Sequence, residues 1–127
     1  MSKLVLIFLG SGIGGVFRYV LSGWAQRLGD GSFPMGTLVV NVAGCAMIGF
    51  LSAAFAGRWF VREEYRIAIV VGVLGGFTTF SAFGMETFGL LNDGQRVRAA
   101  TNMILSVGLS LIAVWIGYRL AERWLGV

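Results

Sequence analysis

The sequence predicts an all-α integral membrane protein with four spanning helices, of which the third is broken near its middle. Of the 127 residues, 57% are hydrophobic and only 13% are charged, whereas soluble proteins carry about 25% charged residues. Three uncharged runs are close to or above the ~20 residues that a spanning helix needs: 31–57, 67–85 and 99–118. A single transmembrane domain is therefore expected over residues 1–127, with spans at about 4–25, 34–56, 67–90 and 99–120.

Small residues and one charge distinguish the first span. Gly10 and Gly14 are four residues apart, with Ser11 and Gly15 on the adjoining row, a spacing typical of close contact between helices. Arg18 interrupts the apolar run, and a guanidinium inside a span needs a carboxylate, carbonyl groups or water, or must extend to the interface. Arg18 is therefore either an interfacial anchor or an attractor of anions at the mouth of a vestibule.

A row of residues at every fourth position marks one face of the second span. Asn41, Cys45, Gly49 and Ala53 form this row, which is typical of a helix interface. Asn41 is its only strongly polar member, so it either bonds to a neighbouring helix or presents its amide to a passing anion; taken alone, the residue favours the first. Cys45 is the only cysteine, so no internal disulfide is possible and a packed thiol is expected.

The third span contains the most informative segment, residues 75–83, GGFTTFSAF. Interrupted backbone inside hydrocarbon is tolerated only where protein buries it or where it lines a wet cavity. Gly75 and Gly76, followed by Thr78 and Thr79, are expected to weaken the helix and leave carbonyl groups free, and such carbonyls suit a hard monovalent cation. This segment is therefore the first candidate for a functional site.

Two aromatic rings follow the predicted break. Phe80 and Phe83 are three residues apart, so on a resumed helix they lie along one face, and Glu86 continues the row. An aromatic ring has a negative face and a positive edge, so two rings turned edge-on can contact an anion without the tight hold of a fixed charge. The alternative is that both rings are ordinary core or lipid-facing hydrophobes.

The fourth span has a polar stripe on an otherwise apolar helix, formed by Asn102, Ser106 and Ser110 at intervals of four residues. A single serine hydroxyl often bonds back to a carbonyl of its own helix and means little. Three polar residues in line predict a wet track along the fourth span.

Charges gather at the ends of the spans. Six Lys or Arg residues belong to the N-terminus, second loop and C-terminus, against three in the first and third loops: Lys3, Arg58, Arg62, Arg66, Arg119 and Arg123 against Arg27, Arg96 and Arg98. The positive-inside rule favours cytoplasmic termini, but this modest bias admits insertion in both orientations. Anchoring at span ends explains the net charge of +4, so nucleic-acid binding is not expected. No histidine is present, and no nucleophile–base constellation is visible, so an enzyme is not expected.

Three motifs, in order, resemble the signatures of the Fluc (CrcB-type) fluoride channels of microorganisms. They are residues 14–19 (GGVFRY), 36–41 (GTLVVN) and 72–83 (GVLGGFTTFSAF), the last followed by Glu86. The resemblance covers the whole chain in length, number of spans and motif order. It implies a fluoride-selective channel in the cell inner membrane that passively exports cytoplasmic fluoride and so reduces its toxicity.

The resemblance also implies an assembly and its ligands. Two copies would insert into the lipid bilayer in opposite orientations and form an antiparallel homodimer. Two fluoride pores would run near the interface between the copies. The backbone carbonyls of Gly75 and Thr78 from each copy would hold a structural sodium ion. Phe80 and Phe83 would line the fluoride path, with Asn41 as a donor. Further polar pathway residues are implied less directly: Thr79, Ser81, Glu86, Ser106 and Ser110.

Two residues of the resemblance raise questions. Ala82 stands where the family pattern commonly has threonine, so one hydroxyl is missing and altered throughput, not loss of function, is expected. Glu86 is an awkward residue in an anion path: it would be protonated, bonded to neighbouring hydroxyls, or off the main route.

Two other classes of protein remain as alternatives. A small four-span exporter of drugs or lipophilic cations has a similar size, but the resemblance known there puts a functional carboxylate in the first span, where this chain has Arg18. A non-transporting packing subunit would explain the glycine rows. It would not explain the combined third-span motif and the serine stripe.

Overall fold

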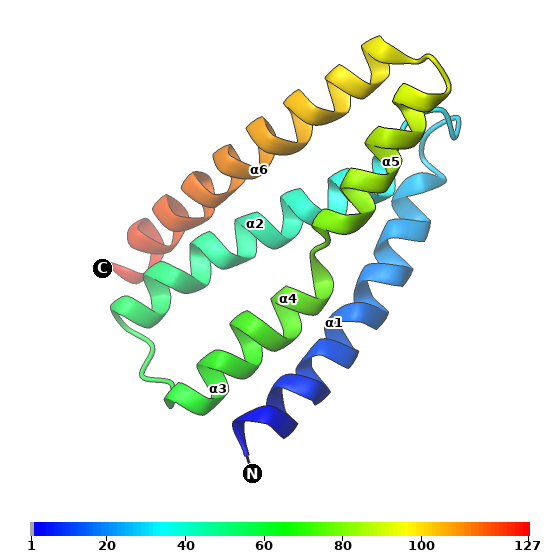
Figure 1. The fold of residues 1–127 in the computed structure, drawn as a ribbon. Helices are drawn as coiled ribbons and strands as arrows, with labels where there is room; N and C mark the ends of the chain where they lie inside the picture. Colours follow the sequence, from blue (N-terminus) through cyan, green and yellow to red (C-terminus); the bar gives the residue numbers. More distant parts are fainter. Residues whose placement is uncertain (1) are drawn as a thin grey trace.

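The computed structural model describes residues 2–127, which form helices joined by short connections (Figure 1). The elements are α1 (Lys3–Gln26), α2 (Met35–Ala56), α3 (Glu63–Ile67), the π-helical segment η1 (Ala68–Leu74), α4 (Gly75–Phe77), α5 (Phe80–Asn92) and α6 (Arg96–Leu125). Four described segments are long and apolar enough to cross a membrane: Lys3–Gln26, Met35–Ala56, Glu63–Asn92 and Arg96–Leu125. The prediction of an all-helical chain with four spans is confirmed.

The third and fourth spans are longer than the sequence predicts. The third includes Glu63 and Glu64 in its first turn, and the fourth begins at Arg96 and continues to Leu125. An uncharged run ends at the first charge, whereas a helix continues through charged residues once they reach the water at the membrane surface. The α6 helix ends at Gly126, whose φ of 66° is left-handed, as is common for a glycine at this position.

Glycines bring the backbones of neighbouring helices together. The α1 helix lies against η1 and α4, and α2 packs most extensively against α6 (Figure 1). A Cβ on Gly10 would lie 2.7 Å from the Ala68 carbonyl oxygen, and one on Gly76 would lie 2.5 Å from the Ser11 carbonyl oxygen. The predicted close contact through the glycine row of the first span is confirmed. Glycines also contact the opposite backbone where α2 meets α6: Gly49 and Gly117.

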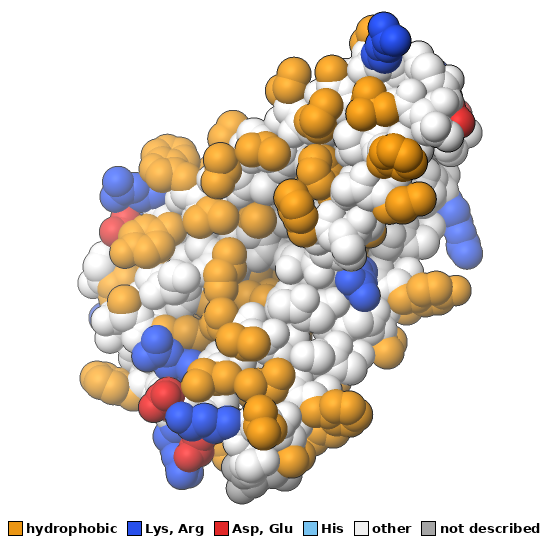
Figure 2. Space-filling model, viewed as in Figure 1, with side chains coloured by type: hydrophobic (Ala, Val, Ile, Leu, Met, Phe, Trp, Pro, Cys, Tyr) orange, Lys and Arg blue, Asp and Glu red, His pale blue; other side chains and the backbone are white. Residues whose placement is uncertain are grey.

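The surface separates charged ends from an apolar middle. The start of α1, the C-terminus and the connection from α2 to α3 lie at the same end of the molecule (Figure 1). Figure 2 shows most of the charged side chains gathered at the two ends, and hydrophobic side chains over the face between them, which is interrupted by blue Lys or Arg atoms near its centre. Large hydrophobic residues such as Phe8 and Ile104 are exposed on this surface. A multi-pass membrane protein has this distribution because its middle contacts hydrocarbon.

Candidate functional site at the break in the third span

The third span breaks at Thr78 and Thr79, between α4 and α5. Both residues have extended backbone, with φ −83° and ψ 158° at Thr78 and φ −152° and ψ 116° at Thr79. The sequence predicts weakness at Gly75 and Gly76 as well, but these two residues are helical. The glycine of this pair that approaches α1 is Gly76, so its small size serves packing. The break itself therefore belongs to the two β-branched residues, which fit extended backbone well.

Asn41 of α2 satisfies the backbone at the break. Its Nδ2 donates to the Thr79 carbonyl oxygen at 3.0 Å, and its Oδ1 accepts from the Thr79 N–H at 2.8 Å. A side-chain amide thus replaces the backbone partners that a continuous helix would supply. Of the two interpretations of Asn41, the bond to a neighbouring helix is the one observed here. The second N–H of the amide is not used by this pair of bonds.

Two hydrogen bonds at the break take the helical donors away from two carbonyl groups. In a continuous α-helix the Gly75 carbonyl would accept from the Thr79 N–H, but that N–H is bonded to Asn41. The Thr78 carbonyl would accept from the Ala82 N–H, but that N–H is bonded to Thr79 Oγ1 at 3.2 Å. Gly75 and Thr78, whose carbonyls the resemblance implies as sodium ligands, are thus among the residues at the break whose carbonyls lose their usual donors.

An open hollow of about 500 Å³ lies beside the break, between α2, the third span and α6. None of the described residues that line it is charged, and it is called the neutral hollow below. Most of the sequence-predicted site residues line it together: Asn41, Gly75, Thr78, Thr79, Phe80, Phe83, Ser106 and Ser110. The structure therefore brings the predicted residues of α2, the third span and α6 to one place.

The two predicted rings lie next to each other in the neutral hollow. The ring centroids of Phe80 and Phe83 are 5.4 Å apart, with an interplanar angle of 43°, within the range of favourable aromatic pairs. Phe80 is 81% exposed, whereas Phe83 is half-buried. Phe80 is thus not a core residue of this chain, and its surface is left for lipid or for another chain.

Part of the polar stripe on α6 turns toward α5. Asn102 is 1% exposed, and its Nδ2 donates to Thr87 Oγ1 at 2.9 Å. Ser106 Oγ donates to Asn102 Oδ1 at 3.1 Å, and Thr87 Oγ1 donates to the Phe83 carbonyl oxygen at 2.7 Å. Only Ser106 and Ser110 of the stripe line the neutral hollow. The predicted track is therefore shorter than the stripe.

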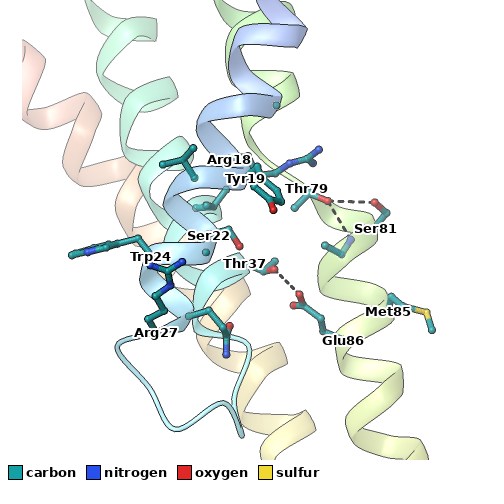
Figure 3. Close-up of a pocket in the computed structure, with 16 residues that line it drawn as sticks. Arg18, Tyr19, Ser22, Trp24, Arg27, Thr37, Thr79, Ser81, Met85 and Glu86 are labelled. Carbon is teal, nitrogen blue, oxygen red and sulfur yellow. Dashed lines mark hydrogen bonds between the residues drawn. The ribbon is translucent and has the colours of Figure 1, made fainter.

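A second hollow, of about 1390 Å³, lies on the other side of the break and is called the charged hollow (Figure 3). Arg18, Arg27 and Glu86 line it, together with Ser81 and Thr79. Thr79 lines both hollows, so the break stands between them. Arg18 takes part in none of the ion pairs between described residues, which leaves its charge available to this hollow.

Glu86 lies in the charged hollow and not with the rings. Its Oε1 accepts a hydrogen bond from the Thr37 hydroxyl at 2.7 Å (Figure 3), and its Oε2 is buried without a partner among the described residues. The sequence predicts that Glu86 continues the row of Phe80 and Phe83. A step of three residues falls about 60° short of a full helical turn, so two steps carry Glu86 about 120° away from Phe80.

Two residues of the site are absent from the sequence-predicted set. Thr37, which holds Glu86, lies in the second motif, but its position next to a carboxylate 49 residues away is a matter of tertiary packing. Thr87 follows Glu86 directly, and a helical threonine is expected to bond to its own helix, as it does. Its second bond, to Asn102, depends on how α5 meets α6 and has no signal in the local sequence.

The spans, the break and the two hollows define a small multi-pass membrane protein with a polar site inside its third span. Residues 5–118 match a family described as "CrcB-like protein, Camphor Resistance (CrcB)". The chain is similar to the fluoride-specific ion channel FluC of Paramagnetospirillum magneticum, with 46% identity over 120 residues, 93% of this chain and 94% of the relative. A protein of the same name from Opitutus terrae is 48% identical over 121 residues, 93% and 91% of the two chains. Another, from Geobacter sulfurreducens, is 40% identical over 123 residues, 97% and 99% of the two chains.

The chain therefore belongs to the CrcB family. The resemblance seen in its three motifs is confirmed by matches over almost the whole length of the relatives.

Proposed function

We propose that the protein is a fluoride-selective channel that lets fluoride leave the cytoplasm passively. One observation carries the proposal: in a chain whose relatives are named fluoride-specific channels, the aromatic, amide and hydroxyl candidates gather around an uncharged hollow. Fluoride is small and strongly hydrated, so a pore has to replace its water with several weak donors that release it again. A channel carries out no covalent step, which agrees with the expectation that the chain is not an enzyme.

The donors would come from three elements. Asn41 keeps one amide N–H beyond the bond to Thr79, Ser110 adds a hydroxyl, and Phe80 and Phe83 add the positive edges of their rings. Glu86 lies in the charged hollow with its carboxylate bonded to a hydroxyl, which supports a position off the ring path. Arg18 would attract anions into that hollow from the water, with Thr79 and Ser81 at its inner end.

Release of fluoride from loaded liposomes tests the proposal. Purified protein in liposomes, with a fluoride electrode, is expected to release fluoride rapidly and a matched chloride load far more slowly. Equal chloride flux, or no fluoride flux from well-folded protein, would remove the central claim. Phe80→Ile and Phe83→Ile are expected to lower fluoride flux by about tenfold or more, a change in barrier of about 1.4 kcal/mol. The matched control is Phe8→Ile, at an exposed ring on α1 away from both hollows, and it should conduct like the wild type.

The channel would be an antiparallel homodimer with two pores. A second copy would cover the exposed Phe80 and the open side of the neutral hollow, in an isologous contact about a two-fold axis. The modest charge bias between the two ends is compatible with insertion in both orientations. Phe60→Cys in a Cys45→Ala background tests this, because Phe60 is fully exposed in the α2–α3 connection. A membrane-impermeant thiol reagent should label about half of the chains from each side; labelling from one side only would contradict dual insertion.

A structural sodium ion would join the two copies through the carbonyls of Gly75 and Thr78. The donor set fits a hard monovalent cation, because both carbonyls lack their helical donors. Among the described residues no group of three or more His, Cys, Asp or Glu side chains could hold a metal ion. Exchange of sodium for a bulky organic cation should lower the melting temperature of the dimer. An unchanged melting temperature after exhaustive exchange would count against the ion.

In the cell, the inner membrane is the proposed location. Fluoride enters from acidic surroundings as neutral hydrogen fluoride and ionises in the more alkaline cytoplasm, and the membrane potential then drives the anion out through the channel. Expression in a fluoride-sensitive bacterial strain should restore growth on fluoride, and Phe83→Ile should not. The cation-exporter alternative finds no support, since the first span places Arg18 where that mechanism needs a carboxylate.

A further inference from the structure

A buried chain of hydrogen bonds joins the helix that carries the rings to the helix that carries the serines. It runs from Ser106 to Asn102 on α6, from Asn102 to Thr87 on α5, and from Thr87 to the carbonyl of Phe83. Asn102, Thr87 and Ser106 are all buried. Both polar atoms of the Asn102 side chain take part in it, Nδ2 as a donor and Oδ1 as an acceptor.

The position of α5 depends on few polar contacts. Glu86 accepts from Thr37 of α2, and the next residue, Thr87, accepts from Asn102 of α6. Consecutive helical residues point about 100° apart, so these two bonds fix α5 from two directions. The backbone of α5 begins at Phe80, immediately after the break, and the Asn102–Thr87 bond is therefore the polar tie that sets the distance between the rings and α6.

The direction of each bond has a consequence for the neutral hollow. Ser106 donates its hydroxyl hydrogen to Asn102 Oδ1, so its lone pairs are what it can turn toward the hollow. An anion needs a hydrogen-bond donor and is repelled by lone pairs. As long as Asn102 holds this orientation, Ser106 lines the hollow but offers it no donor.

The side chains of Ser106, Asn102 and Thr87 can be paired in the opposite sense. A side-chain amide has an acceptor, its oxygen, on one side and a donor, its NH2 group, on the other. A hydroxyl can donate or accept. If the Asn102 amide turns over, Nδ2 donates to Ser106 and Oδ1 accepts from Thr87, whose hydrogen leaves the Phe83 carbonyl. Ser106 is then free to donate into the neutral hollow, and Nδ2 and Oδ1 of Asn102 each keep one hydrogen bond.

We propose that Asn102 and Thr87 are positioning residues of the anion path. They hold the rings of α5 against α6, and the amide of Asn102 determines whether the Ser106 hydroxyl faces the hollow as a donor or as an acceptor. The proposal rests on the channel function proposed above, but it assigns no contact with fluoride to either residue. Under this proposal, the Ser106 hydroxyl can donate into the neutral hollow only when the Asn102 amide is turned to donate to it.

A pair of substitutions at one position separates hydrogen bonding from packing. Thr87→Val keeps the shape and removes the hydroxyl, whereas Thr87→Ser keeps the hydroxyl and removes a methyl group. If Thr87 acts through its hydroxyl, the valine variant should lose about fivefold in fluoride flux, as expected for one lost hydrogen bond, and the serine variant should conduct like the wild type. If the serine variant is the more damaged of the two, Thr87 is a packing residue and the proposal is wrong.

A second experiment tests whether Asn102 acts through Ser106. Asn102→Leu and Ser106→Ala should each lower flux to a similar extent, and the double variant should lose no more than either single variant. Multiplied losses in the double variant, or full flux in Asn102→Leu, would overturn the proposal. The matched control is Thr101→Val, because the neighbouring Thr101 is exposed and bonds only to the Val97 carbonyl of its own helix; its flux should not change.

Failure of the channel function and failure of this proposal are distinguishable. Absence of fluoride flux in the wild type would remove the function alone. The same variants can then be compared by thermal unfolding. Coupling between Thr87→Val and Asn102→Leu should appear as a non-additive change in melting temperature, and additive changes would show that the two residues are independent.

Discussion

Asn41 shows how one side chain can make a helix break possible inside a membrane. Hydrocarbon offers no water to a freed N–H or carbonyl group, and at Thr79 the Asn41 amide supplies both a donor and an acceptor. The bond from the Thr79 N–H to Asn41 leaves the Gly75 carbonyl without its helical donor. The bond from the Ala82 N–H to Thr79 Oγ1 does the same for the Thr78 carbonyl. Asn41 therefore does more than join two helices, because it also frees the Gly75 carbonyl beside the neutral hollow.

Replacement of Asn41 by leucine should therefore damage stability and conduction together. Asn41→Leu keeps the approximate volume and removes both bonds to Thr79, which should cost about 1–3 kcal/mol in the free energy of unfolding, since a part-buried donor and acceptor are left unpaired. Thermal unfolding in detergent and fluoride flux in liposomes are the measurements. Cys45→Ala, one turn further along α2 on the same hollow, is the control and should change neither. A leucine variant as stable as the wild type would show that water or lipid satisfies Thr79 instead.

Ala82 gives a second test at the scale of one residue. It lines the charged hollow beside Thr79 and Ser81, so Ala82→Thr would add a hydroxyl to that hollow and not to the rings. We expect a change in fluoride flux of no more than about threefold, because one exposed hydroxyl contributes less than one buried hydrogen bond. A matched chloride measurement should show unchanged selectivity. An inactive wild type that becomes active on this substitution would contradict the expectation.

Residue types and spacing predicted most of the candidate site, but not the bonds within it. The two rings, Asn41 and the two serines of the stripe, Ser106 and Ser110, could be chosen because polar and aromatic residues inside a span are unusual. The bond between Asn41 and Thr79 joins residues 38 positions apart, and the bond from Thr37 to Glu86 joins residues 49 apart. Such pairs depend on how helices pack, which one sequence does not contain. For Glu86, the three-residue spacing was applied twice from Phe80, and it wrongly placed the residue on the helix face of the rings.

Among the elements, the third span is the least regular, and its first half packs closely on α1. It consists of α3, η1, α4 and α5, and its π-helical segment η1 lies against α1 at backbone distance through Gly10 and Gly72. A π-helical segment is uncommon and often accompanies a functional site. The regular helix α1 thus supports the irregular span along the half that precedes the break.

Glycine positions on these two elements should differ sharply in their tolerance of alanine. A Cβ on Gly76 would lie 2.5 Å from the Ser11 carbonyl oxygen, whereas a Cβ on Gly12 would meet nothing within 4 Å. Gly76→Ala should therefore cost about 1–3 kcal/mol by overpacking, and Gly12→Ala should leave stability nearly unchanged. Thermal unfolding of the two variants, with folded content checked by circular dichroism, makes the comparison. Equal stability of both would mean that α1 and the third span separate easily.

The sequence predicted the number and order of the spans because hydrophobic length alone determines them. It predicted their ends less well, since α3 and α6 begin with charged residues at the membrane surface. It placed the irregularity in the right segment, but the π-helical segment η1 precedes the glycines and the break follows them. Those details depend on the contacts of Gly72, Gly76 and Asn41 with other helices.

At the scale of the whole molecule, one side of the chain leaves residues of the candidate site uncovered. The neutral hollow is open, Phe80 is 81% exposed within it, and the Gly75 backbone is exposed next to the break. The opposite arrangement holds at the contact of α2 with α6, where small residues close the interface. The open side is therefore where a second copy is proposed to bind.

Substitution at Gly75 separates the fold of one chain from the assembly of two. A Cβ here would meet only the Val70 carbonyl oxygen, at 3.9 Å, so Gly75→Trp should leave the single chain folded. In the proposed dimer the added ring would displace the partner, and the mass in detergent, measured by light scattering, should fall from two chains to one, with loss of fluoride flux. Gly84→Trp, at another open position of the third span, is the control. A Gly75→Trp variant that remains dimeric would place the contact elsewhere.

The bond between Asn41 and Thr79 also has a consequence for how the protein is made. Residue 79 leaves the ribosome long after residue 41, and its backbone has no partner at that depth until the earlier span lies beside it. We therefore expect the third span to enter the bilayer as an unbroken helix and to open at Thr78 and Thr79 only when it docks on α2. The oxygen atoms proposed to bind the ion would then become free only after the third span has docked on α2.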